Sequence, residues 1–598
     1  MIPAPGFRRL LVSLACISFA ASTVAPGAPA GPQAFDIVIA GGRVIDGTGN
    51  PWFIADIGIR GDSIAAIGDL DAAGAALVID ATGRLVTPGF IDLHSHADEG
   101  DDSLANPAAA AAPNLVSQGI TTVVVGQDGR CRCPIGERAG LYRRQGIGPN
   151  VVQLLGHGSV RQQVMGRAQR PATPEEIEAM VEVVRQGMRE GAGGLSSGLE
   201  YNPGRYGTTE EVIALAAAAG ELGGFYISHE RSEGRTPMWW LPSMAGRPPD
   251  LVDAVLETIQ IGEATGMTVV ASHIKVKGAD YWGTAPTITR LIEEARERGV
   301  QVYADQYPYT TTGSDGNTVL IPSWALDVEA EETAGAGGRG GGRGPDFAVR
   351  RAAFQRRLED PETEIRIRAD IAHEIRRRGG AERLLILESH NPEFVGLNLS
   401  DVAASQDAAA VDVAIMLQLE GLDRPGGARI RGFSLDELDV EHYMAQDFTA
   451  TATDAGITLP GSGFPHPRFY GSYPRKLRHY VLDNGVMSMA QAVRSSTSLP
   501  AQIAGLARRG ILRAGYAADV VVIDTAEIAD HATAMDPHRY STGIDVVLIN
   551  GELAVRDGAR TGSLAGWVLD GDELARRPLA PAAIGTPRPL PGPAFPGR

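Results

Sequence analysis

Cysteine is scarce in this chain: its 598 residues include only three, Cys16, Cys131 and Cys133. A single residue separates Cys131 from Cys133, and a disulfide across so short a gap would be strained. We therefore expect no disulfide framework to hold this protein.

Positive charge is also scarce relative to negative charge. Lysine and arginine number 54 against 72 aspartate and glutamate residues, which gives a formal net charge of −18. No basic cluster with interleaved aromatic residues occurs in the sequence. Both features argue against nucleic acid or an anionic membrane surface as a partner.

An apolar run of the kind found in targeting signals lies at the N-terminus. Arg8 and Arg9 precede apolar residues 10–24, and Ala28-Pro29-Ala30 is a plausible cleavage site. The run is too short and too rich in alanine and serine to favour a membrane anchor. A lipoprotein signal at Cys16 ranks second, because little apolar sequence precedes that cysteine. We expect residues 1–30 to be a cleaved signal peptide, export to a bacterial periplasm, and no stable membrane span in the mature chain.

The remaining composition, 43% hydrophobic and 21% charged, is typical of a globular protein. The length suffices for one large α/β barrel and a second, small domain. Short strand-like segments with turns fill residues 35–86, and residues 518–524 and 546–551 have the same pattern. We interpret these pieces as one small β-sandwich domain that both ends of the chain complete.

The segments between them alternate between helix and strand, a pattern typical of a parallel (β/α)8 barrel. We expect residues 31–87 and 501–571 to form the small β-domain and residues 88–500 the barrel. An insert at about 310–444 is too long for an ordinary barrel loop, so we expect a lid over the active-site mouth. Its glycine-rich run 335–344 is predicted to be a flexible linker, and the Pro- and Ala-rich tail 572–598 to be disordered.

Eight segments are predicted to be the barrel strands, and helices are predicted at 173–190 and 287–298. In chain order the strands are 85–94, 121–126, 151–157, 194–198, 224–229, 268–273, 300–305 and 449–454.

Four of these strands end in residue types that bind metals. The first ends in His94-Ser95-His96, and alternate residues of a strand point the same way, so both imidazoles leave one face together. His229, His273 and Asp454 end three later strands. Because a barrel brings the C-terminal ends of its strands to one face, these five side chains can converge on a metal site. Any one of them alone would be weak evidence.

With these strand ends the sequence resembles the amidohydrolase superfamily, and within it the N-acyl-D-amino-acid deacylases, or D-aminoacylases. The resemblance covers about residues 35–570. The segments that carry it are Thr87 to His96, Gly119 to Gly126, Ser228-His229-Glu230-Arg231, Ser272-His273-Ile274-Lys275, Ala304 to Tyr309 and His466-Pro467-Arg468. By that resemblance His94, His96 and Asp454 surround one metal position and His229 and His273 hold the other. The family usually carries zinc, as one or two ions.

The chain departs from the family pattern at the bridging ligand. Many D-aminoacylases have a cysteine in a Gly-Asn-Cys-Gly segment after the second strand, and here that segment is Gly126-Gln127-Asp128-Gly129. Other members of the superfamily often draw the bridge from strand four, where this chain has Glu200. We expect Glu200 to bridge the metals, with Asp128 as the second choice. Cys131 or Cys133 folding back into the site remains an alternative.

The resemblance implies hydrolysis of the amide bond of small N-acyl-D-amino acids. Asp454 would act as general base on a zinc-bound water and pass the proton to the leaving amine. The resemblance assigns Arg468 to the α-carboxylate of the substrate, and Lys275 and Tyr307 are candidate helpers. A cyclic-amide or dipeptide hydrolase, of the dihydropyrimidinase or isoaspartyl dipeptidase type, is the nearest alternative. An exported, non-catalytic binding protein on the same scaffold is the alternative from another class.

Overall fold

The computed structural model describes Met1 and residues 35–313, 317–328, 347–461 and 463–574. The expected signal peptide, the glycine-rich run 335–344 and most of the expected disordered tail lie outside these residues. Residues 572–574, which we had assigned to that tail, are described: they follow Asp570 as a short turn, and Leu574 pairs with Leu506. The expectation of disorder is therefore wrong for residues 572–574.

Eight parallel strands form a barrel, and their spatial order follows the sequence. They are β6 (Phe90–Asp92), β7 (Ile120–Val125), β8 (Asn150–Gly156), β9 (Gly194–Gly198), β10 (Phe225–His229), β11 (Val269–Ala271), β12 (Val302–Gln306) and β15 (Thr449–Thr451). Beyond the ends of β6 and β15, Asp454 donates its N–H to the carbonyl of His94 and His96 donates to that of Ala455. These bonds close the barrel at one seam.

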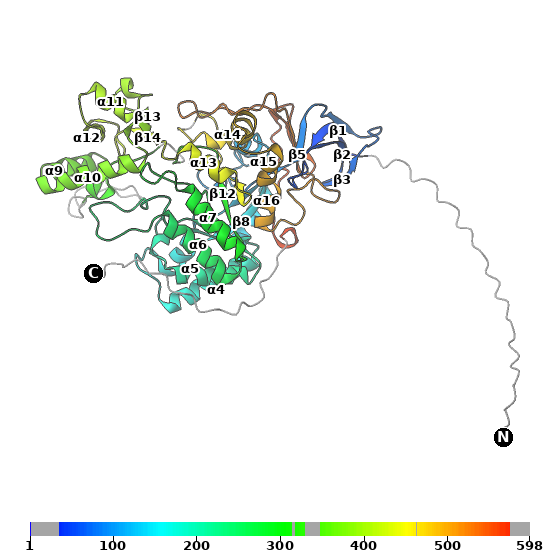
Figure 1. The fold of residues 1–598 in the computed structure, drawn as a ribbon, viewed down its shortest axis with the longest axis horizontal. Helices are drawn as coiled ribbons and strands as arrows, with labels where there is room; N and C mark the ends of the chain where they lie inside the picture. The colour runs from blue at the N-terminus through cyan, green and yellow to red at the C-terminus, as the bar shows by residue number, and fades with distance from the viewer. Residues whose placement is uncertain (2–34, 314–316, 329–346, 462, 575–598) are drawn as a thin grey trace.

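Helices cover the outside of the barrel (Figure 1), among them α4 (Pro174–Arg189), α5 (Thr209–Gly220), α6 (Leu251–Thr265) and α7 (Ala285–Glu297). A Thr173/Glu176 capping box and a proline in the first turn begin α4. Such caps satisfy backbone N–H groups that the helix leaves unbonded. The predicted helices at 173–190 and 287–298 correspond to α4 and α7.

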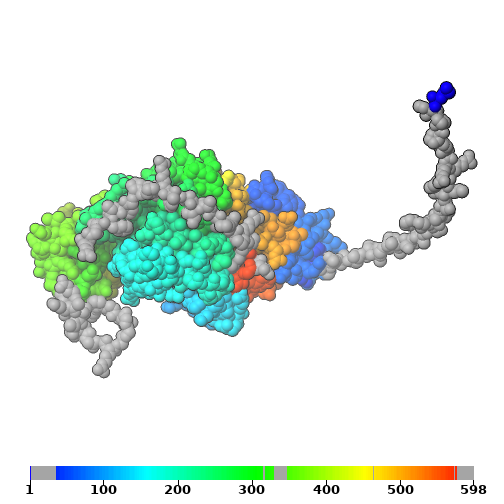
Figure 2. All heavy atoms as spheres, turned by 90° about the horizontal axis from the view of Figure 1, so that it is seen from below, coloured from blue at the N-terminus to red at the C-terminus, as the bar shows by residue number. Residues whose placement is uncertain are grey.

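Strands from both ends of the chain form one sheet beside the barrel. Its order is β19-β18-β17-β16-β5-β1-β2-β3, and β4 (Leu77–Asp80) also pairs with β1 (Ile37–Val44). β16 (Val520–Ile523) and β17 (Ile544–Ile549) come from the C-terminal part. Figure 2 shows the blue N-terminal strands packed against orange and red C-terminal segments. The remaining strands are β2 (Phe53–Arg60), β3 (Ser63–Gly68), β18 (Glu552–Arg556) and β19 (Ala559–Arg560).

The predicted first strand, 85–94, is in fact two strands in two sheets. β5 (Leu85–Pro88) pairs with β1 and β16, whereas β6 pairs with β7 in the barrel. Gly89 lies at the crossing, where its N–H bonds to the carbonyl of Asp519. A Cβ atom at this position would lie 2.2 Å from Oγ1 of Thr121, so no larger residue fits there without a shift. The backbone therefore turns from one sheet into the other at this glycine.

The insert has a core of its own and lies at the end of the molecule away from β1 to β3 (Figure 1). It contains α9 (Phe347–Leu358), α10 (Pro361–Arg377), β13 (Leu384–Glu388), α11 (Leu399–Ser405), α12 (Ala410–Glu420) and β14 (Arg429–Gly432). Arg377 of the insert pairs with Glu200, which follows barrel strand β9. Ser434 accepts a hydrogen bond from the N–H of Gly278, which follows β11. The insert thus packs beside the C-terminal ends of the strands.

The insert is shorter than we predicted. α13 (Glu437–Met444) lies within the predicted range 310–444 but packs as a barrel helix. Its Asp439 accepts hydrogen bonds from the backbone N–H groups of Gly283 and Ala285, at the start of α7.

Among the described residues no single helix is long and apolar enough to cross a membrane, and only α11 and α12 together, bent by 91°, pass that test by length and composition.

Cys131 and Cys133 form a disulfide, contrary to our expectation. The loop brings their Cα atoms to 5.3 Å, which is within the ordinary range for disulfides.

Candidate metal centre

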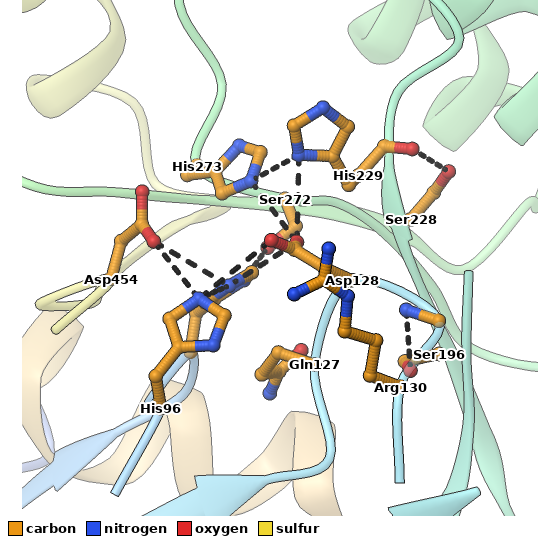
Figure 3. A network of polar contacts seen from close by, with 12 residues as sticks. His96, Gln127, Asp128, Arg130, Ser196, Ser228, His229, Ser272, His273 and Asp454 are labelled. Carbon is orange, nitrogen blue, oxygen red and sulfur yellow. Dashed lines mark hydrogen bonds and ion pairs between the residues drawn. The ribbon is translucent and has the colours of Figure 1, made fainter. Parts of the chain in front are cut away.

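Histidines and carboxylates converge at the C-terminal ends of the barrel strands (Figure 3). His94 and His96 follow β6, Asp128 follows β7, and Asp454 follows β15. His229 ends β10 and His273 lies two residues beyond β11. All five side chains that we predicted from strand ends therefore meet at one place.

Asp128 lies at the middle of this group. Its Oδ1 atom is 3.5 Å from Nε2 of His94, 3.4 Å from Nδ1 of His229 and 3.5 Å from Nε2 of His273. Its Oδ2 atom is 3.7 Å from Nε2 of His96. Oδ1 is buried and accepts no hydrogen bond from any described group.

Two possible metal positions share this aspartate. One group is His94, His96 and Asp128, and the other is Asp128, His229 and His273. Ring nitrogens face one another closely in both, at 3.3 Å between His94 and His96 and 2.8 Å between His229 and His273. Imidazole nitrogens around a shared carboxylate are a donor set that suits zinc. The residues present therefore fit a pair of metal ions.

Glu200, our first choice for the bridge, lies on the far side of His229. Its Oε2 atom is 3.3 Å from Nε2 of His229, the ring nitrogen that faces away from Asp128. Its Oε1 atom accepts a hydrogen bond from the backbone N–H of Met238 and pairs with Arg377. A carboxylate held in this way cannot reach His94 or His96, so a bridge through Glu200 does not fit the geometry. The loop after β7 brings our second choice, Asp128, to the central position instead.

Each histidine is held through the nitrogen that faces away from the centre. Nδ1 of His94 is 2.6 Å from Oγ of Ser272, and Nδ1 of His96 is 3.1 Å from Oε1 of Glu99. Nδ1 of His273 is 2.7 Å from Nζ of Lys275. Such contacts fix the ring orientation of metal-binding histidines.

The backbone at the centre is unusual as well. Asp128, His273 and Asp454 have positive φ angles of 56°, 35° and 50°. Residues other than glycine rarely adopt this region, and such conformations gather at functional sites where the surroundings enforce them.

Within each half of the centre, one imidazole is held neutral and the other charged. Burial lowers the pKa of His94, and burial together with Lys275 lowers that of His273. Burial also opposes the charge on His229, but Glu233 and Asp128 outweigh it and raise its pKa to about 10. At His96 too, burial opposes the charge, but Asp454 and Glu99 outweigh it and raise the pKa. The pKa of Asp128 is lowered, because His229 offsets the effect of its burial.

Asp454 and Arg468 form a pair at the edge of the centre. Oδ1 of Asp454 is 3.2 Å from Nε2 of His96, and Oδ2 accepts a hydrogen bond of 2.6 Å from Nη1 of Arg468. Burial would raise the pKa of Asp454, but Arg468 outweighs it and keeps this pKa low. Nε of Arg468 is buried without a hydrogen-bond partner among the described residues.

Tyr307 lies beside both predicted substrate-binding cations. Its ring centroid is 4.7 Å from the guanidinium carbon of Arg468 and 5.6 Å from Nζ of Lys275. His466 accepts a hydrogen bond from the N–H of Arg468 and packs edge-on against Tyr307. The structure thus brings Arg468, Lys275 and Tyr307 together near Asp454.

Four supporting residues had no role in the sequence analysis. Two of them are Ser272 and Asp305: Asp305 accepts hydrogen bonds from the hydroxyl of Ser272 and from the N–H of His273. The third, Glu233, accepts hydrogen bonds from Lys275 and Lys277. Glu99 is the fourth. Glu99 and Glu233 lie three and four residues after a predicted ligand, a spacing that could have indicated them.

A cavity of about 300 Å³ reaches the centre at Asp128. Glu99, Arg130 and Tyr201 are among the residues that line it. It provides a route to the metal centre for a small molecule.

Comparison with known proteins agrees with this site. A family model described as "Amidohydrolase family" matches residues 77–318 and 405–555. The chain is 34% identical to a D-aminoacylase of Alcaligenes xylosoxydans xylosoxydans over 560 residues, which cover 90% of this chain and 98% of the relative. It is 33% identical to an N-acyl-D-glutamate deacylase of the same organism, with 87% and 93% covered.

Solved structures give the same result. An N-acyl-D-glutamate deacylase from Bordetella bronchiseptica, complexed with zinc and a phosphonate inhibitor, superposes with a TM-score of 0.68 at 30% identity. That match covers 90% of this chain and 100% of the deacylase. A D-aminoacylase with a binuclear metal centre superposes with a TM-score of 0.67 at 31% identity, with the same coverage. A D-hydantoinase, at 16% identity and a TM-score of 0.51, shares the fold. With its barrel and its histidine–carboxylate centre, this chain belongs to the amidohydrolase family.

Proposed function

We propose that this protein is a zinc-dependent hydrolase that cleaves the amide bond of N-acyl-D-amino acids and gives a carboxylate and a D-amino acid. The observation that carries the proposal is Asp128, whose Oδ1 atom lies 3.4–3.5 Å from nitrogens of His94, His229 and His273. Asp128 thereby stands where the two histidine pairs can share one anionic ligand. The relatives named D-aminoacylase and N-acyl-D-glutamate deacylase support the substrate class.

His94, His96 and Asp454 would hold one metal ion, His229 and His273 the other, and Asp128 both. When bound, zinc supplies an activated water and polarises the scissile carbonyl. Asp454, with its low pKa, is ionised at neutral pH and available to accept a proton at Oδ1. It then delivers that proton to the leaving nitrogen.

Arg468 would bind the α-carboxylate of the substrate. A guanidinium can donate two parallel hydrogen bonds to a carboxylate. Arg468 uses Nη1 on Asp454, while its buried Nε lacks a partner among the described residues. Lys275 and Tyr307 would support this binding, since the ring of Tyr307 contacts both Arg468 and Lys275.

A direct assay tests the proposal. The mature chain is purified and its zinc content measured, and release of free amine is followed with N-acetyl-D- and N-acetyl-L-methionine, -leucine, -glutamate and -aspartate. We expect zinc and D-selective release. Zinc without turnover of any D-substrate would contradict the proposal and favour the cyclic-amide or dipeptide alternative. Absence of both metal and activity would favour the binding-protein alternative.

We also propose that the protein is exported to a bacterial periplasm after cleavage near Ala30. Arg8, Arg9 and the apolar residues 10–24 support this proposal. N-terminal sequencing of the chain produced in a Gram-negative host tests it. A periplasmic product that begins near residue 31 is expected, and an uncleaved chain in the cytoplasm would contradict it.

A further inference from the structure

A second cavity, of about 660 Å³, lies apart from the one that reaches Asp128. Three elements line it: the segment between β10 and α6, the segment after β11, and helix α10 of the insert. The volume is within the range of small-molecule sites. The cavity is separate from the catalytic mouth, because its lining does not include Asp128, Asp454 or any of the four central histidines.

Cations dominate this second cavity although the chain as a whole is acidic. Lys277 and Arg377 are buried, at 4% exposure each, and Arg235, Arg247 and Arg376 also line it. Asp250 and Asp280 are the acidic residues of the lining, and acidic residues outside it pair with three of the cations: Glu233 with Lys277, Glu200 with Arg377 and Asp253 with Arg247. Asp250 accepts the N–H of Asp253 at the start of α6. In the lining of the second cavity, cationic side chains therefore outnumber acidic ones.

Two buried donors in the lining have no hydrogen-bond acceptor among the described groups. Arg377 bonds through Nε to the carbonyl of Thr236 and through Nη2 to Glu200, but its Nη1 atom makes no hydrogen bond. The carboxylate paired with Nη1 is that of Glu374, at 3.9 Å. Nε1 of Trp240 is also buried and unbonded. Buried donors without partners are costly, so an added acceptor would stabilise this region.

The lowered pKa of the buried Lys277 also favours a bound anion. Burial lowers the pKa of Lys277 to about 8; Glu233 opposes this effect and Arg377 adds to it. A bound anion would offset the repulsion between Lys277 and Arg377.

Part of the wall is apolar. Trp240, Tyr281, Pro242 and Pro248 lie beside the cations. We propose that the second cavity binds a small organic anion in which a carboxylate or a phosphate is attached to an apolar body. The cations and free N–H groups would bind the charged end, and the aromatic and proline side chains would contact the body.

This site is connected to the metal centre through two ion pairs. Arg377 pairs with Glu200, whose other oxygen contacts His229, and Lys277 pairs with Glu233, which also holds Lys275 beside His273. An anion on Arg377 or Lys277 would compete with these glutamates for the cations. Its binding would thereby change the contacts of Glu200 with His229 and of Lys275 with His273.

Calorimetric titration of the zinc-loaded full chain with 3-phenylpropionate and with phenyl phosphate tests the proposal, with acetate as a probe that lacks the apolar body. A double variant, Arg235→Gln with Arg376→Gln, removes two lining charges. The matched control, Arg290→Gln with Arg298→Gln, removes two exposed charges from α7 and its C-cap residue, outside the cavity. We expect at least one aromatic probe to bind more tightly than acetate. Its affinity should fall tenfold or more in the cavity variant and stay unchanged in the control.

The relative affinity of the two aromatic probes distinguishes a carboxylate ligand from a phosphate ligand. Equal affinity in all three chains would overturn the proposal, because it would place the probe elsewhere, at the metal centre for example. Absence of binding by either aromatic probe would overturn it too. Trp240→Phe keeps an aromatic ring and removes only the free N–H, and a several-fold weaker affinity is expected. Since binding is measured without turnover, failure of the proposed hydrolysis would leave this result interpretable.

Discussion

The two halves of the metal centre differ in how far they are open to solvent. His94, His96 and Asp454, which we term the seam half, lie where β6 and β15 close the barrel. In the seam half the side chains of His96 and Asp454 are 17% and 12% exposed, although that of His94 is fully buried, whereas those of His229 and His273, the buried half, are 2% exposed. Behind the buried half are Glu200, Glu233 and Lys275, all buried.

This difference separates two tasks. Water and substrate are expected to reach the seam half, because Glu99, which contacts His96, lines the cavity at the centre. Asp454 and Arg468 lie in this half, and proton transfer is proposed there. The buried half is held rigidly by charged partners and is suited to retain a metal ion. The four predictions that follow test this division of labour.

The largest effect is expected for Asp454→Asn. Asparagine keeps the size and one oxygen for Arg468 but cannot accept the proton, so kcat should fall on the order of 10²–10⁴-fold. Metal bound by the buried half should remain. Steady-state kinetics and metal analysis of the same preparation measure both. Activity within threefold of the parent chain would show that Asp454 is not the base.

The second prediction concerns the shared ligand. Asp128→Asn removes the anion that faces both halves, and uncompensated buried charge costs about 3 kcal/mol, or roughly 10²-fold in metal affinity. Asp128→Cys is the matched variant, because a thiolate is also an anionic zinc ligand and should retain the metal. Competition with a chelator measures both affinities. Equal affinities in the Asn variant and the parent chain would contradict a shared role for Asp128.

Metal binding should also depend on pH in both halves. His229, with a pKa of about 10 in the metal-free chain, is protonated at pH 7 and must lose that proton to bind a metal. Affinity should therefore rise about tenfold per pH unit below 10, with one proton released. The raised pKa of His96 predicts one more proton for the seam half. Calorimetry in Pipes and Hepes counts the protons, and release of none would contradict these charge states.

The smallest effects on metal affinity are expected for substitutions of Glu200 and Glu99, which contact His229 and His96. Glu200→Gln weakens the orientation of His229 and should lower metal affinity roughly tenfold, the lower end for such supporting residues. Glu99→Gln should cost less, because the Glu99 side chain is 27% exposed and water can replace it beside His96. Chelator competition on both variants gives the comparison. A larger loss for Glu99→Gln would reverse the assignment of the rigid half.

Strand ends made the histidines and Asp454 predictable from the sequence. Apolar runs that stop at a ligand residue identify barrel strands, and the barrel must gather their ends. The bridging ligand was not predictable in this way. Glu200 and Asp128 both follow strands, and choosing between them requires the path of two loops, which put Glu200 behind His229 and Asp128 in front of it.

Other errors have the same origin. The run 85–94 is predicted as one strand, but the chain passes from one sheet to another at Gly89, where Thr121 leaves no room for a Cβ atom. The spacing of Cys131 and Cys133 argued against a disulfide, but the fold of their loop decided the pairing. The end of the insert was misplaced because α13 is recognised as a barrel helix only through Asp439 and the start of α7.

The sequence by itself determined the barrel, the small β-domain built from both chain ends and the donor types of the centre, because strand periodicity and strand-end residues are local patterns. Tertiary structure alone decided which carboxylate lies between the two histidine pairs, which charges support each half and where a second, cationic cavity opens. Those properties depend on distances between residues far apart in the chain, and only the packing of the loops sets these distances.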